Sequence, residues 1–378
     1  MRVVYFGTYR ENYSRNKIMI AALEKAGIEV VTCHETLWTG VQDRIDSVRQ
    51  GWLSLGFWVR LIKIYTKLFK RGIRIKSYDL MICGYPGHLD IFIARILTWI
   101  HRKPLVWDFF MSIYLISLER ELDRSNKVSV FLLRLLEYVG LRLPELIVQD
   151  TKEYVRWLTN TYKIDPTKFV LVPTGADERV FSNGWNYIPS VDPFLVVYYG
   201  SFIENHNVDV IVDAALLLKN SREIQFLLIG EGPTRKRNER VAQDNSATNI
   251  KFMDWVPPSS LVSILRETGL LLGAFGETPQ SLMTIHNKVY EGLAIGIPVL
   301  TGDSKVIREA FSVGEEIIVC SRNDPISLSK SIVMLYNNPD LRLKLSLQGQ
   351  SAYRDRYSFE YQGEILLSTL EQLIRSNL

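Results

Sequence analysis

Short apolar runs recur along this chain and alternate with longer segments whose apolar residues follow a helical period. In the first half, the runs expected to form buried strands are Val3–Phe6, Val30–Cys33, Leu80–Cys83, Leu105–Trp107, Leu146–Gln149 and Phe169–Val172. In the second half, they are Phe194–Tyr199, Gln225–Ile229, Ile250–Phe252, Leu270–Ala274, Pro298–Thr301 and Glu316–Val319. A strand that is apolar along its whole length must be covered on both faces. The alternation therefore predicts an α/β fold with parallel sheets between helices.

The length of the chain, 378 residues, is more than one core usually holds, so two domains are expected. Segment 182–193 lacks periodicity and carries turn residues, which is typical of a linker. We therefore expect one Rossmann-like domain over 1–181 and a second over 194–356. Such domains place ligands at the carboxyl ends of their strands, here facing a central cleft. Small or acidic residues stand at these ends: Gly7, Gly84, Asp108, Gly175, Gly200, Gly230 and Gly276.

The segment from Ile285 to Leu300 has the pattern of a loop, a short helix and a buried strand. Asn287, Lys288 and Glu291 fall in the first turns of that helix. A helix N-terminus presents free N–H groups and a partial positive charge, so it suits a phosphate. Lys288 would add a full charge, and Glu291 could accept hydrogen bonds from a ribose diol. An ordinary helix with a surface ion pair is the alternative, since Lys and Glu at this spacing are common.

Several other classes of site find no support in the sequence. It contains no G-x-x-x-x-G-K-[ST] phosphate loop and no D-x-D triplet, and its five histidines lack metal-ligand spacing, so no metal site is expected. Three cysteines at wide spacing give no disulfide framework, which fits a reducing, cytoplasmic location. The apolar segment at the start of the chain is interrupted too early to be a signal peptide. No run of about 18 apolar residues predicts a membrane span.

Eight Lys or Arg and no acidic residue lie between Arg49 and Tyr78. The cations recur on one helical face, at Arg60, Lys63, Lys67, Lys70 and Arg74, and the other face carries Trp58, Leu61, Ile62, Tyr65, Leu68 and Phe69. Trp52, Leu53, Leu55 and Phe57 add apolar bulk before it. This pattern predicts a helix that lies in a membrane interface, with Trp58 and the cations Arg60, Lys63, Lys67 and Lys70 facing an anionic surface. A core-facing helix with a solvated basic face is the alternative. Nucleic acid is not expected as a partner, because the cations alternate with large aliphatics rather than stacking aromatics.

The order of motifs in the second half resembles the nucleotide-sugar domain of family 4 retaining glycosyltransferases with the GT-B fold. The matching segments are Tyr199–Ser201 with Asp209 and Ala214, Leu228–Pro233, Phe252–Val256 and Asn287–Val299. Val172–Phe181 resembles the domain-junction motif of this family. Tyr357–Glu360 and the helix after it resemble the segment that crosses back, so 357–378 is expected to pack on the N-terminal domain.

The resemblance implies retaining transfer of a sugar from a UDP- or GDP-sugar without a cofactor or an obligatory metal. Backbone N–H groups near Gly200 and at 286–288, together with Lys288, would stabilise the departing diphosphate. The expected donor-binding residues are Gly7, Gly200, Ser201, Gly230, Glu231, Trp255, Val256, His286, Asn287, Lys288 and Glu291. Three departures from the family pattern concern this site: Met283 replaces a frequent Glu, Ser201 and His206 replace Arg and Lys, and His286 replaces Pro.

The first half resembles members that build surface polysaccharides, through segments Gly84–Asp90, Asp108–Tyr114 and Asp150–Tyr154. It is therefore expected to bind the acceptor, a glycan or a lipid-linked saccharide, at the inner face of the cell membrane. Asp108 and His88 are candidates to orient or deprotonate the acceptor hydroxyl, and they join Lys288 as catalytic candidates. A buried structural Asp is the alternative for Asp108. For the whole chain, the alternative is a non-catalytic sugar-nucleotide binding or scaffold protein with a decayed site.

Overall fold

The computed structural model describes residues 1–37, 55–181, 187–188 and 192–377. Trp52, Leu53 and most of the expected linker lie outside this part of the chain. The described residues divide into two compact units. Unit 1 comprises Met1–Pro173 and Phe359–Leu378, and unit 2 comprises Thr174–Ser358. The division therefore falls before the 182–193 segment, at Pro173, and the C-terminal helix belongs to the N-terminal unit.

Unit 1 contains a six-stranded parallel sheet in the order β2-β1-β3-β4-β5-β6. Its strands are β1 (Arg2–Gly7), β2 (Glu29–His34), β3 (Leu80–Cys83), β4 (Leu105–Asp108), β5 (Leu146–Gln149) and β6 (Phe169–Leu171). Its helices are α1 (Ser14–Lys25), α3 (Leu55–Gly72), α4 (Asp90–His101), α5 (Ile113–Glu119), α6 (Leu122–Ser125), α7 (Lys127–Gly140), α8 (Lys152–Tyr162), the 3₁₀ turn Pro166–Lys168 and α17 (Phe359–Ser376).

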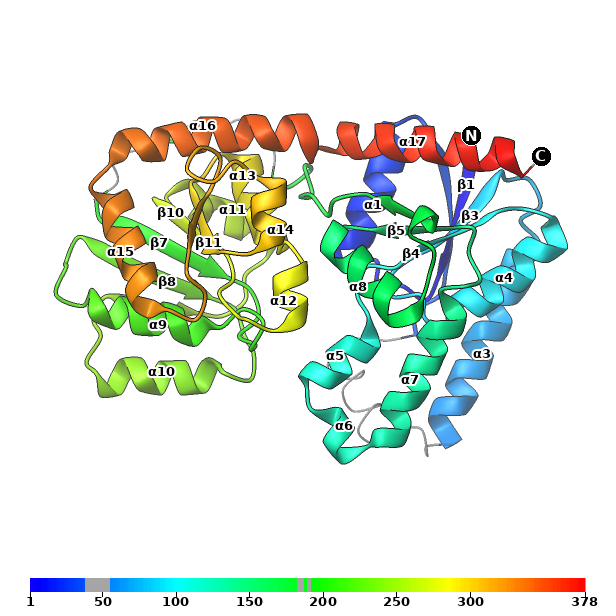
Figure 1. Ribbon diagram of the computed structural model, residues 1–378, viewed down its shortest axis with the longest axis horizontal. Helices are drawn as coiled ribbons and strands as arrows, with labels where there is room; N and C mark the ends of the chain where they lie inside the picture. Colours follow the sequence, from blue (N-terminus) through cyan, green and yellow to red (C-terminus); the bar gives the residue numbers. More distant parts are fainter. Residues whose placement is uncertain (38–54, 182–186, 189–191, 378) are drawn as a thin grey trace. The chain divides into compact units, whose positions relative to one another are not determined.

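The direction of each crossover in unit 1 decides which face its helix covers. From β2 through β5 the chain moves across the sheet in one direction, so right-handed connections place α3, α4 and α7 on the same face. The step from β1 to β2 runs the other way and places α1 on the opposite face. There α17 packs along α1, and its Leu366 and Leu370 are buried against the core (Figure 1).

Unit 2 repeats the architecture with the sheet order β12-β11-β10-β7-β8-β9. Its strands are β7 (Phe194–Tyr199), β8 (Ile224–Ile229), β9 (Ile250–Met253), β10 (Leu270–Leu272), β11 (Val299–Gly302) and β12 (Ile318–Cys320). Its helices are α9 (Val208–Leu217), α10 (Arg235–Asp244), α11 (Pro258–Arg266), α12 (Pro279–Met283), α13 (Asn287–Ile295), α14 (Lys305–Ala310), α15 (Pro325–Tyr336) and α16 (Pro339–Arg356). Two apolar layers, one on each face of the sheet, form its core.

The predicted fold class is confirmed. Each apolar run expected to be a strand overlaps a strand of the structure, and both sheets are parallel. The short strands are apolar and buried on both sides, as β3 and β4 show along their whole length. Within the described part of the chain, no helix is both long and apolar enough to cross a membrane.

Candidate functional site

The first turn of α13 brings Lys288 into the interior of unit 2. Only 5% of this residue is exposed, and its Nζ lies 4.1 Å from the centre of the Tyr198 ring. Among the described residues, the Nζ finds no hydrogen-bond partner. Burial lowers the pKa of Lys288 to about 7, against the opposing effect of Glu291. A buried ammonium without a partner is costly, so this position favours an anionic ligand.

Glycine allows two strand ends to approach this lysine. Gly200 follows β7 with φ of +139°, and a Cβ there would lie 3.0 Å from the Nζ of Lys288. Gly230 follows β8 with φ of +130°, and a Cβ there would lie only 2.0 Å from the Gly200 carbonyl oxygen. A side chain at either position would therefore separate the loops or displace the lysine.

Glu291 lies one turn beyond Lys288 and is also buried. Its Oε2 accepts a hydrogen bond from the hydroxyl of Tyr199. Burial raises the pKa of Glu291 to about 7, while Tyr199 and Lys288 act to lower it. Both adjacent tyrosines of β7 thus contact the start of α13. The sequence analysis did not assign Tyr198 or Tyr199 to the site, although the paired aromatics at a strand end were a signal.

Two histidines stand beside Lys288, and their ring centres are 4.8 Å apart. The Nδ1 of His206 lies 2.7 Å from the Ser201 carbonyl oxygen, which can only accept, so Nδ1 carries the proton. Burial, and next the charge of Lys288, lower the pKa of His206 and of His286 well below the usual value. Both rings are therefore neutral at pH 7. Asn287, the first residue of α13, is half-buried beside them.

The remaining expected donor-binding residues of unit 2 follow the neighbouring strands β8 and β9. Glu231 and Trp255 are exposed, the latter by 66%, and Val256 packs against the core. Arg235 joins the two loops, because its Nη1 donates to the Gly230 carbonyl at 2.5 Å and to the Met253 carbonyl at 3.1 Å. Arg235 was not among the residues expected at this site.

Gly7 belongs to unit 1, whereas the Lys288 cluster belongs to unit 2. A Cβ on Gly7 would lie 2.6 Å from the Oδ2 of Asp90. That carboxylate accepts from the Thr8 amide at 2.7 Å and from the Tyr65 hydroxyl at 2.6 Å. Asp90 therefore occupies the turn after β1, in the space that the glycine leaves.

Asp108 ends β4 and is fully buried. Its carboxylate receives the guanidinium of Arg15, with Nη2 at 2.9 Å and Nε at 3.0 Å from Oδ1. Arg15 also donates to the Val172 carbonyl at 3.1 Å, so the pair ties α1 to two strands. This environment favours a structural role for Asp108, the alternative given above, over a catalytic role in contact with a substrate.

His88 follows β3 and is also buried. Its Nε2 lies 3.1 Å from the Oε1 of Glu137 on α7, and its Nδ1 has no partner among the described residues. Glu137 also accepts from the Ser112 hydroxyl at 2.6 Å and from the Ile113 amide at 2.6 Å. Burial acts to raise the pKa of Glu137, but the bonds from His88 and Ser112 lower it overall. The carboxylate therefore fixes the ring, with Nδ1 left as the free lone pair.

The helix that was expected to lie in a membrane interface is α3. Part of its apolar face and part of its basic face contact the protein instead. Leu68 is fully buried and Tyr65 donates to Asp90, so the second half of the apolar face packs on the protein and not on lipid. Lys67 forms an ion pair with Glu35 at 2.7 Å, and Arg60 donates to a backbone carbonyl. The core-facing alternative thus describes this half of α3. Lys63, Lys70 and Trp58 remain exposed.

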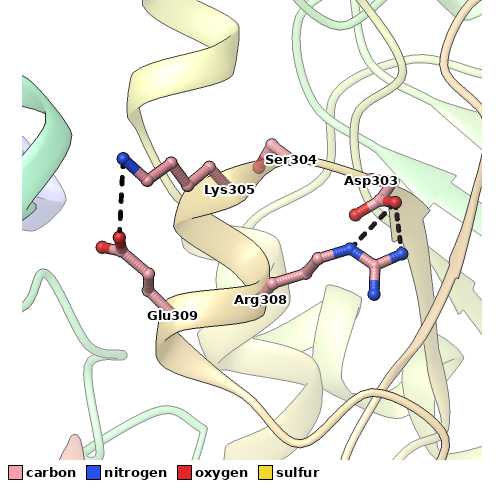
Figure 2. Close-up of a pocket in the computed structure, with 5 residues that line it drawn as sticks. All are labelled: Asp303, Ser304, Lys305, Arg308 and Glu309. Atoms are coloured by element: carbon pink, nitrogen blue, oxygen red, sulfur yellow. Dashed lines mark hydrogen bonds and ion pairs between the residues drawn. The ribbon is translucent and has the colours of Figure 1, made fainter.

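A surface depression at the start of α14 is lined by residues of opposite charge (Figure 2). Arg308 is directed at Asp303, with Nε 3.1 Å from Oδ2, and Lys305 lies 3.9 Å from Glu309. These charges satisfy one another, so the depression presents no net charge to a ligand. In the described part of the chain, no cluster of His, Cys, Asp or Glu could hold a metal ion.

Comparison with known proteins gives a match over part of the chain. Residues 193–338, from β7 through α15, match the family model described as "Glycosyl transferases group 1". This part of the chain is therefore similar to a group 1 glycosyl transferase domain. It contains Gly200, Gly230, Lys288 and Glu291. An uncharacterized glycosyltransferase of Methanocaldococcus jannaschii is 24% identical over 191 residues, and the alignment spans about half of each chain (50% and 50%).

Solved structures with the same fold cover nearly all of the chain. The Anabaena protein HepE, in complex with UDP and glucose, superposes with a TM-score of 0.69 at 12% identity, over 98% of this chain and 100% of that one. Sucrose-phosphate synthase from Thermosynechococcus elongatus superposes with a TM-score of 0.71 at 13% identity, over 100% of both chains. The two doubly wound units are those of the GT-B fold.

Proposed function

We propose that this protein is a glycosyltransferase that transfers a sugar from a UDP- or GDP-sugar to an acceptor hydroxyl, with retention of anomeric configuration. The observation that carries the proposal is the buried Nζ of Lys288, which has no partner among the described residues and lies against the Gly200 turn. The group 1 match over 193–338 supports a nucleotide-sugar donor, as do the UDP and UDP-glucose complexes of HepE.

The chemistry follows from where charge develops. The bond between the anomeric carbon and the diphosphate oxygen breaks, the acceptor oxygen forms a bond to that carbon on the same face, and the proton of the acceptor hydroxyl passes to the departing diphosphate oxygen. Lys288 and the backbone N–H groups at the start of α13 would stabilise the negative charge on the departing diphosphate. Glu291, one turn further on, would accept from the ribose hydroxyls. Because these groups supply the positive charge, the proposal includes no obligatory metal, and transfer is expected to persist in EDTA.

The acceptor is proposed to be a glycan or a lipid-linked saccharide at the inner face of the membrane, in surface polysaccharide or glycan synthesis. The exposed Lys63 and Lys70 on α3 support an anionic surface as partner. His88 is the candidate that acts on the acceptor hydroxyl, since Asp108 is held by Arg15. We expect His88→Gln to lower kcat while leaving UDP-sugar affinity unchanged, because His88 belongs to the other unit.

The test is transfer from labelled UDP- and GDP-sugars to membrane lipid extract, after a thermal-shift screen has identified the donor. A donor at about 100-fold its Kd should raise stability by about 2.7 kcal/mol. The anomeric configuration of the product is then read by NMR. Turnover by the wild type and its loss in Lys288→Met are expected, and normal turnover of the variant would overturn the role of Lys288.

A non-catalytic nucleotide-sugar binding protein is the second candidate, and Met283 favours it. This residue ends α12 where related proteins often carry Glu, so one acidic group of the donor site is missing. Binding of a nucleotide sugar without turnover, across all donors and lipid extracts, would support this candidate. Introducing the acid with Met283→Glu would then be expected to raise turnover if the fold is an attenuated enzyme, and to leave it at zero in a binding protein.

A further inference from the structure

Helix α7 carries a stripe of large apolar side chains on its outer face. Val128, Phe131 and Leu132 are exposed by 69%, 63% and 55%, and the stripe continues through Leu135 and Tyr138. Steps of three and four residues place these side chains on one side of the helix. An apolar stripe of this size is unusual on a soluble surface and indicates a binding partner.

Two other helices of unit 1 also carry exposed apolar side chains. On α4, Trp99 and Ile100 are exposed by 67% and 54%, and on α3, Ile62 is exposed by 62%. Helix α3 contacts α4. A Cβ on Gly140, at the end of α7, would lie 3.5 Å from the Ile91 side chain of α4. The three helices are therefore adjacent on one face of the unit 1 sheet (Figure 1).

The charges on these helices are all of one sign where they meet solvent. Helix α3 contains no acidic residue, and the single acids of α4 and α7, Asp90 and Glu137, are both buried. The exposed charges are cations, among them Lys63, Lys127 and Arg134. Next to α7, the exposed acid Glu121 is paired with Arg124 at 2.6 Å. An apolar surface whose own helices expose only cations complements an anionic lipid bilayer, where apolar side chains enter the interface and cations meet headgroup phosphates.

Glu137 explains why α7 presents this face outward. Its carboxylate is held from the inner side by Ser112, Ile113 and His88, at 2.6 to 3.1 Å. These bonds fix the rotation of the helix about its axis. The residues opposite Glu137 on the helical wheel must then face solvent, although they are apolar.

We propose that the outer faces of α3, α4 and α7 together bind an anionic lipid bilayer, with the apolar stripe of α7 inserted in the interface. The inference deepens the proposed function, because it assigns the membrane contact mainly to α7 and not to the basic face of α3 alone. It rests on the membrane part of that function and is independent of the donor chemistry of unit 2.

The test is co-sedimentation of the full chain with vesicles of phosphatidylcholine alone or mixed with phosphatidylglycerol. The variant replaces Phe131, Leu132 and Leu135 by Ser. Its matched control replaces Ile326, Leu343 and Leu347 by Ser, which are exposed apolar residues on α15 and α16 of unit 2. The α7 variant loses three apolar side chains that would leave water on binding, so it should bind mixed vesicles at least about tenfold more weakly, and the control should bind as the wild type does.

A second variant, Lys127→Gln with Arg134→Gln, should reduce the preference for phosphatidylglycerol. Unchanged vesicle binding by the Ser variant of α7 would overturn the proposal. The proposal would also be overturned if the wild type formed dimers in sedimentation equilibrium and did not bind vesicles, since the stripe would then bind a second copy. A thermal shift of every variant by UDP-glucose serves as the separate readout. If neither UDP-glucose nor any other UDP- or GDP-sugar shifted the wild type, the proposed donor class would be contradicted and the membrane result would stay intact.

Discussion

At the scale of single residues, two buried groups of opposite type meet at the start of α13. Lys288 and Glu291 are each shifted by burial toward neutrality, and the pKa of both lies at about 7. A binding site that keeps an ammonium out of water without a partner is less stable when empty than an apolar one. That penalty is what an anionic ligand would relieve. The two residues therefore allow predictions on stability and on pH.

Replacing Lys288 by Met should stabilise the empty protein and abolish donor binding. Met has a similar length and no charge, and exchange of a buried ion for an apolar residue can gain about 1–4 kcal/mol. Because the pKa of Lys288 falls from 10.5 to about 7 on folding, the penalty is fully present below pH 7. It is relieved as pH rises from 7 toward 10.5. Denaturant titrations should show the largest gain at pH 7 or below, and a loss of stability in this variant would contradict the prediction.

Binding of UDP-glucose should weaken as pH rises above about 7. The ligand favours charged Lys288, whose pKa without ligand is about 7, so Lys288 takes up a proton on binding above that pH. Protonation of the neutral His206 or His286 would act in the same direction. Ionisation of Glu291, whose pKa is also about 7, would act in the opposite direction, so the measurement is made in Glu291→Gln. Isothermal titration in two buffers of different ionisation enthalpy measures the uptake. UDP-glucose is preferable to UDP, whose terminal phosphate itself titrates near roughly pH 6. Lys288→Met, if it retains weak binding, should lose most of this pH dependence.

At the scale of elements, the site depends on how closely two strand-end loops approach. Both Gly200 and Gly230 have a positive φ, but only Gly230 would place its Cβ within 2.0 Å of another backbone atom. Arg235 then holds the second loop to the end of β9. The loops therefore have little freedom to accommodate a side chain.

Gly230→Ala should impair donor binding much more than a glycine substitution with comparable backbone strain alone. Gly314 provides the control, since its φ is +87° and a Cβ there would meet nothing within 4 Å. Gly314→Ala should cost about 1–2 kcal/mol of stability and spare UDP-glucose binding. Gly230→Ala should cost more and reduce affinity at least about tenfold, as measured by calorimetry. Equal effects of the two substitutions would show that the approach to Gly200 is unimportant.

At the scale of the whole molecule, the chain contributes its last helix to its first unit. Helix α17 buries Leu366 and Leu370 against the core that contains β1 and β3. Gly363 lets it approach α1, because a Cβ there would lie 2.6 Å from the Ala22 carbonyl oxygen. Unit 1 is therefore complete only when the C-terminal segment is present, whereas the residues of the Lys288 cluster all belong to unit 2.

Leu366→Ala with Leu370→Ala should destabilise unit 1 and leave donor binding in place. Each substitution removes a fully packed side chain, at about 2–5 kcal/mol. Calorimetric unfolding should show one transition, from unit 1, whose midpoint temperature is lower in the variant and does not change with UDP-glucose. A second transition, from unit 2, should still rise with ligand. Glu371→Ala, at a half-exposed position on the same helix, should change neither. A single transition shifted by both mutation and ligand would contradict this independence.

The sequence by itself determined the fold, and it supplied the residues on which the proposed donor site rests. Runs of apolar residues can be buried only as covered strands, so their alternation with helices specified two parallel sheets. Lys288 and Glu291 were found because a helix start after a buried strand has its own pattern. The tertiary structure decided which side chains lie next to one another. The spacing of apolar residues within one element does not determine which other elements pack against it. Arg15 reaches Asp108 across 93 residues, Asp90 fills the turn at Gly7, and Glu137 turns the apolar stripe of α7 outward. These pairings arise from packing between distant elements, which periodicity alone does not specify.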